Sequence, residues 1–360
     1  MTAEKLPDPI LITRKAALQR LAEALARQKV VAVDTESNSL YAYREQVCLV
    51  QFSTDEADFL VDPLALPDLS PLGEVFSSPQ IEKVFHAAEY DLICLRRDFG
   101  FEFANLFDTM MAARILGWEA VGLGSILEQN FGVHVDKRQQ RADWGQRPLP
   151  PQLLDYARMD THFLIELRNR LETELQHKGL WMLALEDFKR LSCLKSIDGD
   201  GRAPAEDESL GCWRVSGAYD LSSQQAAVLM ELCRYRDQQA RLRNRPLFKV
   251  INDSTLLAIA TQLPRNLDEL SRLPGMSPGQ VRRHGSALLQ AMQRGQKAAP
   301  IFPPRAPRPD ERFSDRLEAL RRWRKITGQE LGMGSDVVLP RDLLFCLAEE
   351  NPVQPEKLAA

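Results

Sequence analysis

The distribution of apolar residues in the first half of the chain restricts its fold more than any other feature. Residues 30–37 (VVAVDTES) form a short β-branched run, and residues 46–54 and 57–62 repeat this pattern after brief polar breaks. Three such runs predict three strands in a meander. From 71 to 175 the spacing becomes mainly helical, with one further strand at IEKVFHA. The sequence therefore predicts an α/β domain over residues 1–175, extended by a helix at 180–197.

The helices expected in this domain follow the strand IEKVFHA. The segments EYDLICLRRDF, MMAARILG and GLGSILEQNFG each have helical spacing, and LLDYARMDTHFLIELRNRLETEL has it over a longer stretch that predicts one continuous helix.

A chain of 360 residues is too long for one ordinary core, so further domains are expected. Residues 198–216 are a predicted linker, since DGDGRAPAEDESLG is rich in Gly, Pro, Ser and acids. Residues 217–297 have purely helical periodicity and predict a small all-α domain. Residues 298–311 are a proline-rich spacer, and helical spacing resumes over 312–360. We therefore expect an α/β domain at 1–197, then helical regions at 217–297 and 312–360.

Charge and cysteine content narrow the possible functions. The net charge is −4, yet residues 217–297 hold 12 Lys/Arg against 6 Asp/Glu, which suggests a polyanionic partner for that region. The six cysteines include no C-x-x-C pair, so a disulfide framework or a zinc knot is not expected. No apolar run approaches membrane-spanning length and the first residues do not resemble a signal peptide, so we expect a cytoplasmic protein.

Five residues carry the candidate chemistry. Asp34 and Glu36 lie two apart on a strand, so their carboxylates project from the same face. Two such charges repel and are costly to desolvate unless a cation lies between them. Tyr156 and Asp160 lie four apart on one helix face, and Asp91 opens the helix after IEKVFHA. Each feature alone has an ordinary structural explanation, so the argument depends on their combination.

In that order these residues resemble the DEDD exonuclease superfamily, in the subgroup marked by a tyrosine. The segment DKRQQRADWGQRPLPPQLLDYARMD (136–160) is similar to the signature of the ribonuclease D family. VDTE (33–36) with LVQF (49–52), and FHAAEYD (85–91), match its first two motifs. Residues 217–297 resemble an HRDC domain through CRYRDQQAR and RPLFKVINDSTLLAIA, and 312–360 resemble a second, partial or degenerate copy.

The resemblance implies a fold and a mechanism. The fold would be a ribonuclease H-like α/β domain, a mixed sheet flanked by helices, followed by all-α HRDC-type domains. Two Mg²⁺ or Mn²⁺ ions would activate water and stabilise the leaving 3′-oxygen. Asp34 would bridge both ions, Glu36 and Asp160 would hold the ion that activates water, and Asp91 would reach the other through water. Tyr156 would orient the attacking water, since a phenol is a weak base near neutral pH.

Each candidate RNA contact also has a structural alternative. His86 could touch the terminal nucleotide or be a buried structural histidine. A merely solvated loop is the alternative for Lys137, Arg138 and Arg141. We expect a packing role for Trp144 and a paired strand residue at Gln51. In the helical domain the candidates share a basic surface that could bind RNA or be ordinary surface charge: they are Arg234, Arg241, Arg243, Arg245 and Lys249.

We therefore expect a 3′→5′ exoribonuclease that releases nucleoside 5′-monophosphates from tRNA precursors or other structured RNA with a free 3′ end. Two rivals remain, a DNA 3′→5′ exonuclease and a non-catalytic RNA-binding scaffold. A monomer with no obligate protein partner and no membrane contact is the expected form.

Overall fold

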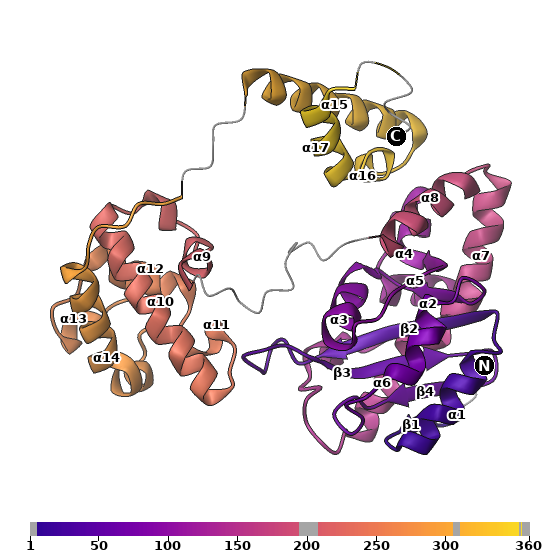
Figure 1. The fold of residues 1–360 in the computed structure, drawn as a ribbon, viewed down its shortest axis with the longest axis horizontal. Coiled ribbons are helices and arrows are strands. Elements are labelled where there is room, and N and C mark those ends of the chain that lie inside the picture. The colour runs from indigo at the N-terminus through magenta and orange to yellow at the C-terminus, as the bar shows by residue number, and fades with distance from the viewer. Residues whose placement is uncertain (1–5, 194–207, 305–309, 353, 355–360) are drawn as a thin grey trace. The chain divides into compact units, whose positions relative to one another are not determined.

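The computed structural model describes residues 6–193, 208–304, 310–352 and 354. Contacts divide the chain into two units (Figure 1). The described residues of Met1–Ser37, Val47–Ile197 and Pro307–Ala360 form the first unit. Those of Asn38–Gln46 and Asp198–Ala306 form the second. None of the helices in the described part of the chain is both long and apolar enough to cross a membrane.

The first unit is built on a six-stranded mixed sheet with strand order β1-β4-β3-β2-β5-β6. The strands β2, β3 and β4 pair in antiparallel fashion in that order, which confirms the predicted meander. Three pairs are parallel: β1 with β4, β5 with β2, and β6 with β5. β2 is therefore a central strand. The strands span Ile10–Ile12 (β1), Val30–Ser37 (β2), Val47–Ser53 (β3), Asp58–Val61 (β4), Glu82–Phe85 (β5) and Leu106–Asp108 (β6).

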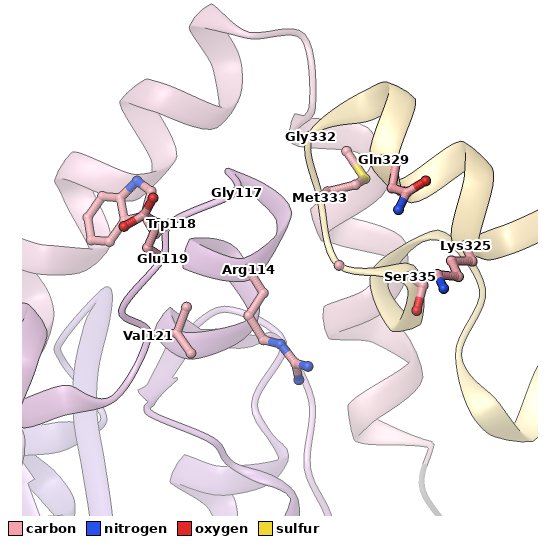
Figure 2. A pocket seen from close by; sticks show the side chains of 12 residues that line it. Arg114, Gly117, Trp118, Glu119, Val121, Lys325, Gln329, Gly332, Met333 and Ser335 are labelled. Atoms are coloured by element: carbon pink, nitrogen blue, oxygen red, sulfur yellow. The ribbon is translucent and has the colours of Figure 1, made fainter.

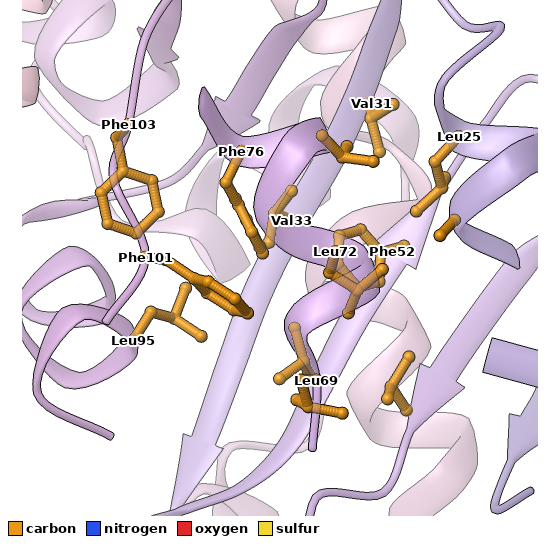
Figure 3. Packing of buried hydrophobic residues seen from close by; sticks show 14 of the residues in the cluster. Leu25, Val31, Val33, Phe52, Leu69, Leu72, Phe76, Leu95, Phe101 and Phe103 are labelled. Carbon is orange, nitrogen blue, oxygen red and sulfur yellow. The ribbon is translucent and has the colours of Figure 1, made fainter. Parts of the chain in front are cut away.

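One face of this sheet is covered by α1 (Lys15–Leu25), α2 (Gly73–Ser77) and α3 (Glu89–Phe99). Val31, Val33 and Phe52 project from the strands into this layer, and Phe76 lies among them with its ring centroid 5.8 Å from that of Phe52 (Figure 3). Each fully buried side chain of this size contributes about 2 kcal/mol by its removal from water. The alternate residues of β2, Ala32, Asp34 and Glu36, consequently project from the opposite face.

The opposite face is covered by the later helices, α4 (Thr109–Ile115), α5 (Leu123–Phe131), α6 (Pro151–His162), α7 (Leu164–His177) and α8 (Trp181–Ser192). The expectation of one helix across α6 and α7 is wrong, because the helix is interrupted at Phe163. The two neighbouring side chains there are held by different elements. Phe163 packs on Phe131 of α5, whereas the His162 ring lies 2.9 Å from Asp58 of β4.

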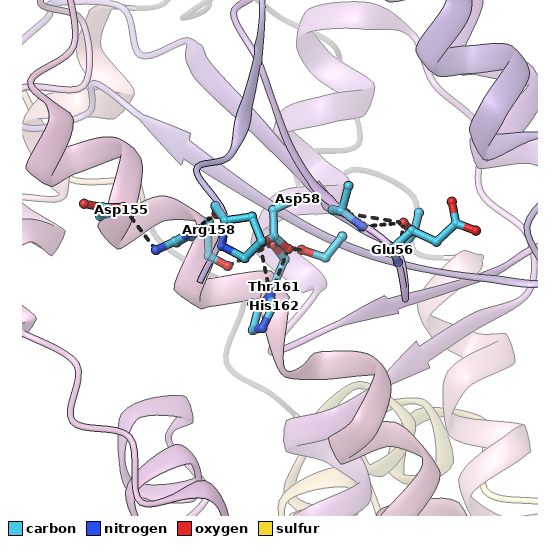
Figure 4. Close-up of polar contacts among 10 residues, drawn as sticks. Glu56, Asp58, Asp155, Arg158, Thr161 and His162 are labelled. Atoms are coloured by element: carbon cyan, nitrogen blue, oxygen red, sulfur yellow. Dashed lines mark hydrogen bonds and ion pairs between the residues drawn. The ribbon is translucent and has the colours of Figure 1, made fainter. Parts of the chain in front are cut away.

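Polar contacts anchor the C-terminal end of α6 to the sheet (Figure 4). Ser53 Oγ lies 2.6 Å from Asp58 Oδ1 and 2.7 Å from Thr161 Oγ1. Together with the His162–Asp58 contact, these bonds fix α6 across β3 and β4. The side chains that α6 carries one turn earlier are thereby held over the central strands.

A C-terminal helical segment completes the first unit, with α15 (Glu311–Leu331), α16 (Ser335–Val338) and α17 (Arg341–Glu350). Val337 is buried in the same core as α4, α7 and α8, and the Arg114 guanidinium forms an ion pair with Asp336. Gly117, at φ +78°, lies so close to Gly332 that a Cβ there would overlap the Gly332 carbonyl oxygen. A pocket of about 560 Å³ lies between the C-terminal part of α4 with the residues after it and the segment from α15 to α16 (Figure 2).

The second unit is a small helical core formed by α9 (Glu208–Trp213), α10 (Ser223–Arg243), α11 (Leu247–Val250), α12 (Asp253–Gln262), α13 (Leu267–Ser271) and α14 (Pro278–Lys297). α10 begins at a capping box in which Ser222 and Gln225 bond reciprocally. α9 falls inside the expected linker 198–216, because its Cys212 and Trp213 are buried in this core. The portion 198–207 of that linker lies outside the described residues.

The segment Asn38–Gln46, which follows β2 in the sequence, also belongs to the second unit. The Tyr43 hydroxyl donates to Asp237 at 2.5 Å and accepts from Arg241 Nε at 2.8 Å. The Lys249 ammonium lies 3.8 Å from the centre of the Tyr41 ring. These contacts attach the segment to residues far along the chain.

All six cysteines are free thiols, and four of them are buried.

Candidate active site

β2 presents two acids at the centre of the sheet. Asp34 and Glu36 project from the face that α6 covers, opposite Gln51 and Leu49 of β3. The register between β2 and β3 shifts between Glu36 and Ser37, so regular pairing ends directly after the second acid. Both carboxylates therefore lie where the covered sheet opens to a pocket.

A turn between β5 and α3 brings a third acid to the same place. Ala87 adopts φ +63°, and Asp108 Oδ1 and Oδ2 accept hydrogen bonds from the amides of Ala87 and Ala88 at 3.1 and 2.7 Å. This turn sets the start of α3, which carries Asp91 in its first turn. The Asp91 side chain is buried and accepts a hydrogen bond from the Thr35 hydroxyl of β2. Asp91 is thereby tied to the strand that carries the first two acids.

α6 supplies the remaining two candidates, Tyr156 and Asp160, one turn apart. The helix starts at two prolines, where an N-terminal proline costs no hydrogen bond. Tyr156 is buried against Trp144, with ring centroids 6.1 Å apart, and hydrogen-bonds to Asp160. The Gln140 side chain also bonds to Tyr156. The phenol is therefore held from two sides.

These elements enclose a pocket of about 400 Å³, to which α5 contributes its first residues. Asp91 does not line the pocket and lies behind Thr35, which does. The larger pocket beside the C-terminal segment has a single acid, Glu119, among the described residues that line it. The chemistry therefore points to the smaller pocket, whose polar lining includes Asp34, Glu36, His86, Gln140, Tyr156 and Asp160.

Burial and neighbouring negative charges raise the pKa values of all four acids. For Asp34 the pKa is well above its ordinary value because of burial and then the charges of Asp91, Asp160 and Glu36. Burial followed by Asp160 and Asp91 likewise raises the pKa of Glu36. Burial raises the pKa of both Asp91 and Asp160 to about 7. Such mutual destabilisation of ionised groups is what a bound cation would relieve.

The acids fit divalent cations in ligand chemistry, because carboxylate oxygens are the ligands that Mg²⁺ and Mn²⁺ prefer. Among the described residues, no three His, Cys, Asp or Glu side chains already form a group that could hold an ion. The carboxylates are thus close enough to interact electrostatically, and they would have to turn toward one another to share an ion.

The His86 ring contacts two neighbouring segments of the fold. Its Nδ1 lies 2.9 Å from Thr109 Oγ1, and its ring also bonds to the backbone of Val121. Burial lowers its pKa below the ordinary value, which favours the neutral ring at pH 7. His86 lines the pocket, yet its ring is engaged in joining β5 to the segment before α5.

The candidate RNA contacts before α6 are only partly described. The side chain of Lys137 lies outside the described residues. Arg138 forms an exposed ion pair with Asp136 at 2.6 Å, and Arg141 is exposed and already interacts within the chain. The candidates of the second unit divide similarly. All five are exposed, and three of them have intramolecular partners: Arg234 (with Glu231), Arg241 (with Tyr43 and Asp237) and Lys249 (with Tyr41).

Three residues near the acids were not among the sequence candidates: Thr35, Asp108 and Gln140. Thr35 is the middle residue of Asp-Thr-Glu. Because side chains alternate along a strand, we did not expect Thr35 to contact Asp91, yet its hydroxyl bonds to that acid. Gln140 lies between the basic candidates of 137–141, where only charge was considered. Trp144 is buried, which confirms its packing role, and Gln51 is buried with an unpaired side-chain amide, contrary to expectation.

Comparisons with known proteins agree with this geometry. Residues 9–176 match the family model described as 3′-5′ exonuclease, and residues 225–292 and 313–360 match the HRDC domain model. The chain is 32% identical to ribonuclease D of Pseudomonas paraeruginosa over 350 residues, covering 96% of this chain and 90% of that protein. It is 33% identical to protein RRP6-like 3 of Arabidopsis thaliana over 279 residues, 72% of this chain but only 31% of that longer protein.

The fold also matches a solved structure. The crystal structure of Escherichia coli RNase D, described as an exoribonuclease involved in structured RNA processing, superimposes with a TM-score of 0.69 at 26% identity. The match covers 96% of this chain and 91% of that one.

Proposed function

Since this chain belongs to the ribonuclease D family of 3′-5′ exonucleases, we propose that it removes nucleotides from RNA 3′ ends at the pocket between β2 and α6. Family membership gives the enzyme class, a hydrolytic exoribonuclease. The observation that supports the location is a group of four acids: Asp34, Glu36 and Asp160 are half-buried around an open pocket, Asp91 is buried behind it, and neighbouring acids raise the pKa values of Asp34 and Glu36.

Asp34, Glu36, Asp91 and Asp160 would hold two divalent cations, Mg²⁺ or Mn²⁺. Cations held there supply a hydroxide nucleophile near neutral pH and offset the charge of the leaving 3′-oxygen. Thr35 keeps Asp91 oriented through its hydroxyl. His86 holds the pocket wall at Val121, since both of its ring contacts are structural.

Tyr156 would position the attacking water. Burial, followed by the charges of Asp160 and Glu36, raises the pKa of this phenol above its ordinary value, so its hydroxyl keeps its proton near pH 7. A protonated hydroxyl can hold a water molecule in place but cannot remove its proton. Gln140 and Asp160, which bond to Tyr156, fix the direction of that hydroxyl.

The proposed product is a nucleoside 5′-monophosphate, since water would attack the last phosphodiester and leave the 3′-oxygen on the shortened RNA. Structured transcripts such as tRNA precursors are the proposed substrates, because RNase D of Escherichia coli is involved in structured RNA processing. Basic side chains outside the pocket, with Arg243 and Arg245 in exposed positions, would add salt-dependent and sequence-independent affinity.

The test is hydrolysis of matched single-stranded RNA and DNA labelled at the 5′ end, with Mg²⁺ or Mn²⁺, followed by product analysis. We expect stepwise shortening of RNA from its 3′ end with release of 5′-monophosphates. The Asp34→Asn variant should lose this activity and retain RNA binding. A clear preference for DNA, or full activity of Asp34→Asn, would contradict the proposal.

A further inference from the structure

Gln51 is a buried polar residue that the proposed mechanism does not yet use. Its exposed fraction is 0%, and both its side-chain nitrogen and its side-chain oxygen lack a hydrogen-bond partner among the described residues. A buried amide without partners costs about 1–3 kcal/mol for each unsatisfied group. Native proteins seldom carry such a cost, so its position demands a physical reason.

The register of the sheet places Gln51 beside the candidate site. Gln51 on β3 is the direct antiparallel partner of Asp34 on β2. Directly opposed residues share a face, with Cβ atoms about 5 Å apart. Two residues further along the same face, Ser53 bonds to Thr161 of α6. The Gln51 amide is therefore confined between the sheet and α6, within side-chain reach of the Asp34 carboxylate.

The orientation of the acid side chains explains why this amide has no partner. They are not gathered as cation ligands, and Asp34 would have to turn to become one. A carboxylate that holds a cation keeps lone pairs free for further donors, and such outer hydrogen bonds orient metal ligands in proteins. A neutral amide suits this purpose, because it donates without adding to the negative charge of the four acids.

We propose that Gln51 is a positioning residue for the metal site: its Nε2 donates a hydrogen bond to Asp34 when Asp34 turns to hold a divalent cation. This inference rests on the proposed function. The unsatisfied amide then disfavours the cation-free arrangement, and its bond to Asp34 favours the loaded one. Gln51 would raise affinity for the cation without touching it.

The test compares Gln51→Met with the wild type in two measurements. Methionine has nearly the same shape and no polar group to leave unpaired. We expect the variant to be more stable than the wild type in EDTA, measured by urea unfolding. We expect its Mn²⁺ affinity, measured by calorimetry without RNA, to be about 10–100-fold weaker. A purely structural glutamine would not move these two quantities in opposite directions.

Thr54→Ala is the control, because Thr54 follows Ser53 at the end of β3, does not line the pocket, and its hydroxyl bonds within its own turn. It should lose stability and keep wild-type Mn²⁺ affinity. If Gln51→Met does not fold, Gln51→Asn retains an amide that is too short to reach Asp34 and should also bind Mn²⁺ more weakly.

Unchanged Mn²⁺ affinity in the folded Gln51 variants would overturn the inference, and so would a loss of stability in EDTA for Gln51→Met. Failure of the proposed function has a different signature: the wild type itself would neither bind Mn²⁺ at this site nor shorten RNA.

Discussion

Replacing Asp91 with asparagine should stabilise the cation-free protein in a way that depends on pH. Burial raises the pKa of Asp91 from 3.8 to about 7. An acid whose pKa is raised by folding stabilises the fold fully below its unfolded pKa and loses that contribution as pH rises through the folded value. Ionised Asp91 therefore costs stability above pH 7. Asparagine has the same shape, cannot ionise, and can still accept the Thr35 bond.

The shift sets the magnitude. A difference of about three pKa units corresponds to about 4 kcal/mol once the carboxylate is ionised in both states. For one independent group, the advantage of Asp91→Asn should be about 4 kcal/mol at pH 8 and less than about 2 kcal/mol at pH 5. Asp34 and Asp160 interact with Asp91, so the acids share this energy and the figure is an upper limit.

The assay is urea unfolding in EDTA from pH 4 to pH 9, with Thr54→Ala as a control that removes a half-buried turn hydroxyl outside the pocket. Added Mn²⁺ should reverse the order and stabilise the wild type more than Asp91→Asn, because the variant has lost a ligand. A stability difference that stays constant across this pH range would refute the reasoning, and so would a variant less stable than the wild type at pH 8 in EDTA.

Three further outcomes follow from described contacts. Tyr156→Phe should lower kcat about 100-fold, since the hydroxyl that positions water is lost; steady-state kinetics would check this. Arg147→Ala should lower the free energy of unfolding by about 3 kcal/mol or more, because it leaves the buried Asp62 carboxylate without its bidentate partner; urea unfolding would measure the loss. Gly117→Ala should destabilise the first unit by about 2 kcal/mol or more, through the positive φ and overlap with Gly332, detectable as a lower urea midpoint.

The sequence predicted the parts of the fold that periodicity controls. The meander β2–β3–β4 and the helices of the second unit follow from strand alternation and helical spacing. β1 and β6 were not predicted, because three-residue strands are too short to show a period. The interruption at Phe163 was also missed, since it depends on contacts with Asp58 and Phe131 that lie far away in the sequence.

For the site, the five residues singled out in the sequence do come together around one pocket, with Asp91 behind Thr35. Their motif spacing carried this information. Which side chains lack partners could not be foreseen. Gln51 was expected to be paired and is not, and the bond from Arg241 to Tyr43 was not predicted. Pairing is a property of the assembled fold, which residue spacing alone does not encode.

The attachment of Asn38–Gln46 to the helical unit means that the two units cannot be separated by a single cut in the chain. A fragment that ends before residue 198 would keep Tyr41 and Tyr43 but remove Lys249, Asp237 and Arg241, which hold them. A fragment that starts at residue 198 would lack the segment Asn38–Gln46, which belongs to the same unit. Studies of the isolated catalytic domain would thus alter the strand connection that begins one residue after β2, the strand of the first two acids.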